Sequence, residues 1–261
     1  MAGLLSLKGQ TPVSGTSSAL QKLFSSLITG TRDSDRIRIN DSIKFIIDSY
    51  AESDSVLRHR FYNLRYLGQI SSPDSRLKII TWNLLLNNSK SKYYCYFINR
   101  SGKKNFIYKL SGEYNEKPVR TDTTYSEGDW YGALYYDVRP VKKDNQLSWM
   151  LLGIDYGNPV VTRKIIEVLS ITPEGKLVFG KKWFVAGEET KYREVLEYSP
   201  SAVISLKFMS DKSIVFDHLV PISPAFSDNR EHYGPDFSFD SYNFEKGIWR
   251  MKLNVDVRNK E

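Results

Sequence analysis

The chain has 261 residues, 41% of them hydrophobic, which is enough to bury a sizeable core. Charged residues make up 26%, so the composition excludes a chain that is disordered throughout, and the single cysteine, Cys95, excludes an intrachain disulfide or a zinc site built from cysteines. The net charge is +7, but the Lys and Arg residues are dispersed, which favours a solvated basic surface over a nucleic-acid site. No apolar stretch approaches the roughly 20 residues of a transmembrane helix, so we expect no transmembrane span.

The first residues resemble the end of a secretory signal, because apolar Leu4, Leu5 and Leu7 precede Gly9 at a position suited to cleavage. The basic region and most of the apolar region of such a signal are missing, so a flexible N-terminus is an equal alternative. We therefore interpret residues 1–17 as a flexible lead-in or a signal remnant.

Helical patterning is confined to residues 18–65, a segment that we expect to pack on the sheet that follows. The first helix would be capped by Ser17 or Ser18 and would end at Gly30. The second would begin at Asn40 or Asp41. The apolar residues at helical spacing are Leu20, Leu23, Phe24, Leu27 and Ile28 in the first helix, and Ile43, Ile46, Ile47 and Tyr50 in the second.

From about residue 66 onward the apolar period changes to two, which is typical of strands. The sequence therefore predicts a mostly β fold of antiparallel sheets (a sandwich, an open barrel or a meander of hairpins), with one β domain over residues 66–261 behind the helical segment. The expected strands are residues 77–84, 92–99, 105–110, 131–138, 148–154, 163–171, 176–179, 203–209, 213–219, 241–244 and 248–255.

Four short runs carry a resemblance to a known group of proteins. They are Trp-Tyr-Gly-Ala-Leu-Tyr-Tyr at 130–136, Thr-Arg-Lys-Ile-Ile-Glu-Val-Leu at 162–169, Val-Phe-Asp-His-Leu at 215–219 and Tyr-Gly-Pro-Asp at 233–236. In these runs, and over roughly residues 70–257, the chain resembles an uncharacterised family of exported envelope proteins from gram-negative bacteria. The resemblance implies a periplasmic or outer-membrane-associated location and supplies no catalytic residues.

The histidines are the first candidates for a site. His218 lies in an apolar strand beside Asp217, and strand alternation sends the two side chains to opposite faces, so each needs another partner. A histidine satisfied within the core or an interface is the favoured interpretation of His218, with ligand or partner binding as the alternative. His232 and the neighbouring Tyr233 lie in a polar loop that we treat as a second candidate.

That loop, residues 227–240, is rich in oxygen ligands. Asp228, Asp236 and Asp240 could hold Ca²⁺, although their spacing does not match an EF-hand, and turn-capping by these side chains is the favoured interpretation. No other cofactor is expected. Asp155, in the turn-like segment 155–159, has the same ambiguity.

An aromatic group follows the polar loop 125–129. Trp130, Tyr131, Tyr135 and Tyr136 could stack on a sugar ring or anchor a partner, but strand alternation places at least one of Tyr135 and Tyr136 in the core. Core packing is favoured over a binding platform.

No nucleophile elbow, zinc-protease motif or phosphate-binding loop occurs, so we predict no catalytic residues. The sequence favours a non-catalytic binding or assembly protein of the bacterial envelope. Its expected partner is a protein of the envelope, such as an outer-membrane complex, or a glycan, and no nucleic acid. The alternative is a hydrolase acting on glycan or peptidoglycan, which predicts a concave pocket with convergent carboxylates or His218.

Overall fold

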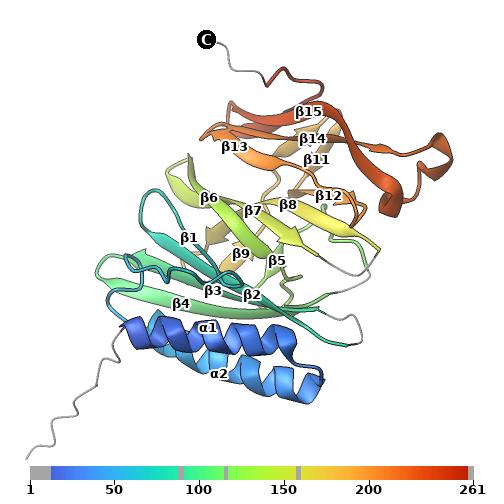
Figure 1. The fold of residues 1–261 in the computed structure, drawn as a ribbon. Coiled ribbons are helices and arrows are strands. Elements are labelled where there is room, and N and C mark those ends of the chain that lie inside the picture. The colour runs from blue at the N-terminus through green and yellow to red at the C-terminus, as the bar shows by residue number, and fades with distance from the viewer. Residues whose placement is uncertain (1–12, 88–90, 115–116, 157–159, 258–261) are drawn as a thin grey trace, which may run out of the picture.

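A computed structural model describes residues 13–87, 91–114, 117–156 and 160–257. It confirms the predicted fold class: two N-terminal helices precede three largely antiparallel sheets. The helices and sheets stack in chain order as layers, with the helices at one end and the C-terminal sheet at the other (Figure 1). The expected signal remnant up to Gln10 and the end of the 155–159 turn lie outside the described residues.

The helix layer consists of α1 (Val13–Thr29) and α2 (Asp33–Ala51). Both helices begin earlier than the sequence predicts. For α2 the reason is electrostatic, because Asp33 and Asp35 occupy its first turn, where carboxylates are favoured by the helix dipole. Most of the predicted apolar stripes face the core, since Leu20, Phe24 and Ile43 are buried against the first sheet, but Ile28, at the end of the first stripe, is exposed.

Sheet A is a meander in the order β1-β2-β3-β4. The helices cover one of its faces and sheet B covers the other, so its central strands are buried on both sides and Cys95 is fully buried. Its strands are β1 (Gly68–Ser71), β2 (Leu77–Leu85), β3 (Ser91–Ser101) and β4 (Lys104–Glu113).

Sheet B is the central layer, in the order β5-β9-β8-β7-β6, with β12 also paired to β8. Consecutive residues of β8 serve two cores: Ile165 packs toward sheet A and Ile166 toward sheet C. This two-sided burial explains why β7 and β8 read as nearly continuous apolar runs. The strands are β5 (Tyr125–Ser126), β6 (Leu134–Lys143), β7 (Gln146–Asp155), β8 (Thr162–Ile171), β9 (Leu177–Phe179) and β12 (Arg193–Tyr198).

Sheet C has the order β11-β10-β16-β15-β14-β13, and its β10–β16 pair is parallel. One face packs on sheet B through buried side chains that include Phe216, Tyr242 and Trp249. The strands are β10 (Phe184–Ala186), β11 (Glu189–Lys191), β13 (Leu206–Ser210), β14 (Ser213–Pro221), β15 (Tyr233–Glu245) and β16 (Ile248–Lys252), with the short helices η1 (Pro224–Phe226) and η2 (Arg230–His232) between β14 and β15.

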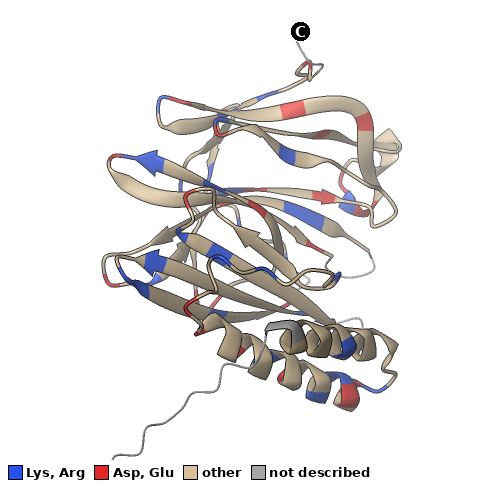
Figure 2. Cartoon of the chain, turned by 60° about the vertical axis from the view of Figure 1, so that its left-hand side comes forward, with Lys and Arg blue, Asp and Glu red and all other residues tan. Residues whose placement is uncertain are grey.

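Charged residues are spread over all the layers, with Lys and Arg interspersed among Asp and Glu (Figure 2). No helix in the described ranges has the length and apolar content that crossing a bilayer requires.

Candidate functional site

The apolar core between sheets B and C ends in a pocket of about 430 Å³, a size typical of small-molecule sites. Its walls come from β12, β14, β15, β16 and the segment 118–121. The charged or titratable residues that line it are Lys191, Glu194, Glu197, Asp217, His218, Arg230 and Asp240.

His218 and Asp240 reach this pocket because strand alternation turns them inward. On β14, His218 follows the buried Ile214 and Phe216 on one face, and on β15, Asp240 precedes the buried Tyr242. Positions that alternation would assign to the apolar core therefore carry an imidazole and a carboxylate. Polar residues at core positions are a common feature of functional sites, because they do not serve packing.

A bulge in β15 makes room for the imidazole. Asp217 pairs with Phe239 while Leu219 pairs with Pro235, so residues 236–238 stand opposite His218 without regular pairing. Asp236 holds the bulge by accepting hydrogen bonds from the backbone N–H (3.0 Å) and hydroxyl (2.7 Å) of Ser238. Bulges of this kind re-aim side chains next to binding and active sites.

Asp240 orients the imidazole. Nδ1 of His218 lies 2.7 Å from Oδ2 of Asp240, whose other oxygen accepts the Asn254 backbone N–H at 3.1 Å. Because the carboxylate can only accept, Nδ1 carries the proton and Nε2 is left for a ligand. The prediction that Asp217 and His218 need separate partners is confirmed, since Asp217 instead accepts the backbone N–H of Ser205 at 2.7 Å.

Glu194 is the third inward-facing polar side chain. It accepts the Tyr242 hydroxyl at 2.5 Å and lies 3.3 Å from the Lys191 ammonium. Burial, followed by the Glu194 charge, raises the pKa of Tyr242, so this phenol stays a proton donor to the carboxylate.

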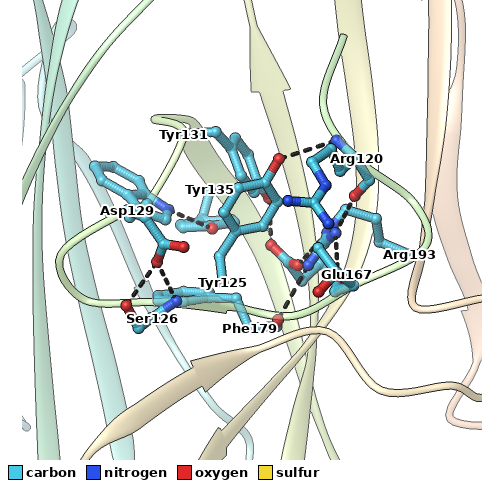
Figure 3. A network of polar contacts seen from close by, with 11 residues as sticks. Arg120, Tyr125, Ser126, Asp129, Tyr131, Tyr135, Glu167, Phe179 and Arg193 are labelled. Atoms are coloured by element: carbon cyan, nitrogen blue, oxygen red, sulfur yellow. Dashed lines mark hydrogen bonds and ion pairs between the residues drawn. The ribbon is translucent and has the colours of Figure 1, made fainter.

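The segment 118–121 is held in place by a buried ion pair on the other face of β12. Arg193, next in the chain to Glu194, points between sheets A and B, where its Nε lies 2.6 Å from Oε1 of Glu167 (Figure 3). Its Nη1 donates to the Arg120 carbonyl and, at 2.9 Å, to the Thr123 carbonyl, and its Nη2 donates to the Phe179 carbonyl at 3.0 Å. The pocket wall is thus tied to the interior of the molecule.

The aromatic group predicted at residues 130–136 also lies mainly in the core between sheets A and B. Trp130 and Tyr135 are buried and joined by a 3.0 Å hydrogen bond, and Tyr131 donates its hydroxyl to Glu167 (Figure 3). These rings face the space between sheets A and B, so they are core residues and do not form an exposed platform. Tyr136, on the opposite face, donates to the Leu206 carbonyl at 3.1 Å.

Asp155 is also structural. Its carboxylate accepts the Tyr93 hydroxyl at 2.6 Å and lies 3.4 Å from Arg163, which in turn pairs with Glu197 at 2.8 Å. Arg163 thus links the predicted site residue to Glu197, which lines the pocket.

The candidate residues of the 227–240 loop do not gather at one place. Asp228 and Asp236 are exposed, whereas Asp240 is buried beside His218. His232 packs on Phe226 at 4.1 Å between ring centroids, and the Tyr233 hydroxyl donates to the Ser227 carbonyl at 2.6 Å. Within the described ranges no three His, Cys, Asp or Glu side chains gather as a metal site requires, so the suggested Ca²⁺ site has no structural support.

Sequence reasoning missed Glu194, Lys191 and Arg230. The alternation of Glu194 with the apolar Leu196 and Tyr198 was a signal that could have identified β12 and its inward carboxylate. Nothing in the local sequence indicates that Arg230 returns to the same pocket.

Comparison of the chain with known protein families, with characterised proteins and with solved structures finds no significant match. The role of the pocket therefore rests on its geometry.

Proposed function

We propose that this chain is a non-catalytic binding protein of the bacterial envelope that takes a small polar ligand in the pocket between sheets B and C. The observation that carries the proposal is the inward placement of His218, Asp240 and Glu194 at strand positions that would otherwise complete an apolar core. The envelope location rests on the sequence resemblance alone.

The hydrogen bonds around the pocket support binding over catalysis. Asp240 and Glu194 are both engaged by protein donors, so neither stands ready as a free general base. In the described part of the chain, the hydrogen-bond partner of His218 is Asp240, and no hydroxyl or thiol nucleophile is bonded to its ring. Activation of a serine, threonine or cysteine nucleophile by histidine as a general base depends on that second contact.

A pocket-blocking variant tests the proposal. Met251 lines the pocket, so Met251→Trp should fill it. Met209, which is 47% exposed on β13 and does not line the pocket, provides a control site for the same substitution. We expect a screen of small polar compounds by amide chemical shifts to find ligands that perturb pocket residues. Met251→Trp should weaken the binding of these ligands at least tenfold, and Met209→Trp should leave their binding unchanged. Ligands that bind equally well to both variants would overturn the proposal.

A hydrolase acting on glycan or peptidoglycan is the second candidate. The His218–Asp240 pair favours it, because a carboxylate at Nδ1 is how a histidine is oriented to accept a proton at Nε2. This candidate predicts that envelope glycan or peptidoglycan fragments are cleaved by the purified chain and that His218→Gln abolishes cleavage. Fragments that bind and stay intact over long incubation would favour the binding protein.

A further inference from the structure

The charges that line the pocket are unequally satisfied, and this identifies the chemistry of the ligand. The carboxylates each have a partner: Asp240 has His218 at 2.7 Å, Glu194 has Lys191 at 3.3 Å, and Glu197 has Arg163 at 2.8 Å. Asp217 accepts a backbone N–H at 2.7 Å, and its charge acts on the Lys164 ammonium. Each of these carboxylates is therefore already engaged by a hydrogen-bond donor of the protein.

Arg230 is different. Arg230 is exposed at the rim of the pocket, its guanidinium lies over the ring of Tyr233, 4.3 Å from the centroid, and within the described ranges it makes no ion pair. Tyr233 is itself fixed, since it is 7% exposed and its hydroxyl is bonded to the Ser227 carbonyl. The stacking holds one planar face of the guanidinium and leaves its in-plane N–H donors available.

We propose that the pocket binds a small carboxylic acid, whose carboxylate pairs with Arg230 while Nε2 of His218 contacts a polar group of the same ligand. This inference rests on the proposed function and adds the class of ligand. A single guanidinium fork matches one carboxylate in two parallel hydrogen bonds. The carboxylates of Asp217 and Asp240 in the same lining would also repel a doubly charged phosphate more strongly than a monoanion. A cationic ligand would meet the unpaired Arg230 and only carboxylates that already have partners.

Two matched probe compounds isolate the contribution of the carboxylate to binding. N-acetylglycine and N-acetylglycinamide have nearly the same shape, but the first is an anion and the second is neutral. We expect N-acetylglycine to shift the Arg230 side-chain signal and the pocket amides in a saturable way. The amide should bind at least tenfold more weakly, and inorganic phosphate should not compete at equal concentration.

Two arginine variants provide the control. Arg230→Gln should reduce binding of N-acetylglycine to the level of the amide, and Arg230→Lys should restore only part of it, because an ammonium lacks the planar fork. Arg58→Gln, an exposed arginine far along the chain from the pocket, should leave binding unchanged. Both glutamine variants remove one positive charge, so an effect of net charge alone would appear in each.

The inference is overturned if the amide or phosphate binds as tightly as the acid, if N-acetylglycine leaves the pocket signals unchanged, or if Arg230→Gln has no effect. A neutral or cationic compound that binds in the pocket and is excluded by Met251→Trp would sink the carboxylate inference while the proposed binding function stands. Compounds that bind regardless of Met251→Trp would count against both.

Discussion

At the scale of single residues, the feature with the largest desolvation cost is the ion pair of Glu167 and Arg193, because both side chains are fully buried. Burial raises the pKa of Glu167 from its ordinary value, and the Arg193 charge opposes that shift. The guanidinium is satisfied by Glu167 and by the carbonyls of Arg120, Thr123 and Phe179. This pair therefore fixes a unique arrangement of chain segments.

Removal of one partner of this pair should be costly. Glu167→Gln leaves the Arg193 charge buried without a counter-charge, so we expect the free energy of unfolding in urea to fall by about 3 to 5 kcal/mol. The exposed pair Glu245–Lys252 is a matched control, with N and O at 2.6 Å, and Glu245→Gln there should cost far less, because water screens the pair. Similar losses for the two variants would show that the buried pair has no special role.

Lys78 gives a prediction about pH. It is 1% exposed, and its ammonium donates to the Tyr50 hydroxyl at 2.8 Å, the Val56 carbonyl at 2.9 Å and the His59 carbonyl. Burial, followed by the Arg60 charge, lowers the pKa of Lys78 to about 8. In the unfolded chain the pKa of a lysine side chain is ~10.4. Between these two pKa values the unfolded chain binds more protons than the folded chain, so the free energy of unfolding rises with pH.

The test compares the pH dependence of the free energy of unfolding of wild type with that of Lys78→Met. From pH 7 to 9.5 the free energy of unfolding of wild type should rise by about 2 kcal/mol relative to the variant, since groups common to both proteins cancel. A constant difference over this range would contradict the lowered pKa.

At the scale of elements, the turn between β6 and β7 illustrates how local sequence specifies a hairpin. Asp144 and Asn145 both have positive φ, 51° and 60°, as a two-residue hairpin turn with the right twist requires. Asn145→Gly should preserve stability, whereas Asn145→Val should lower the free energy of unfolding by about 1 to 2 kcal/mol, because a β-branched side chain is strained at positive φ. Equal stability of the two variants in thermal unfolding would contradict this account of the turn.

Elements with a clear period and turn chemistry could be predicted from the sequence. Strands β2, β8 and β14 lie within a few residues of their predicted bounds, because alternation or a long apolar run marked each one. The three-residue strands β10 and β11 were missed because so short a run carries no period, whereas β9, equally short, was predicted because it follows the turn at 172–175. Strand β15 extends well before its predicted start because its first half contains the bulge at 236–238, which interrupts the alternation.

The same limit applies to the candidate site. Sequence reasoning singled out His218 and Asp240 separately, because each stood out against its neighbours. It could not bring them together, since their contact depends on the register between β14 and β15. For the aromatic group at 130–136 the sequence favoured core packing but left a binding platform open, and the stacking of sheet A on sheet B places Trp130 and Tyr135 in the core.

At the scale of the whole molecule, sheet B supports both of the apolar layers between sheets. The core between sheets A and B is closed by the Glu167–Arg193 pair, whereas the core between sheets B and C opens into the pocket at His218. Strand β12 joins the two, with Arg193 on one face and Glu194 on the other. We propose that the Glu167–Arg193 pair serves the fold and the His218–Asp240 pair serves a ligand.

The double variant His218→Leu/Asp240→Leu tests that claim most directly, by its free energy of unfolding in urea. If the pair exists for a ligand, apolar replacements at these inward-facing positions should extend the neighbouring core. Stability should then stay within about 1 kcal/mol of wild type or rise above it, because replacing both partners of a buried hydrogen bond by apolar groups is often close to neutral or stabilising. A loss of about 3 kcal/mol or more, comparable to that expected for Glu167→Gln, would contradict the account and assign the pair to the fold.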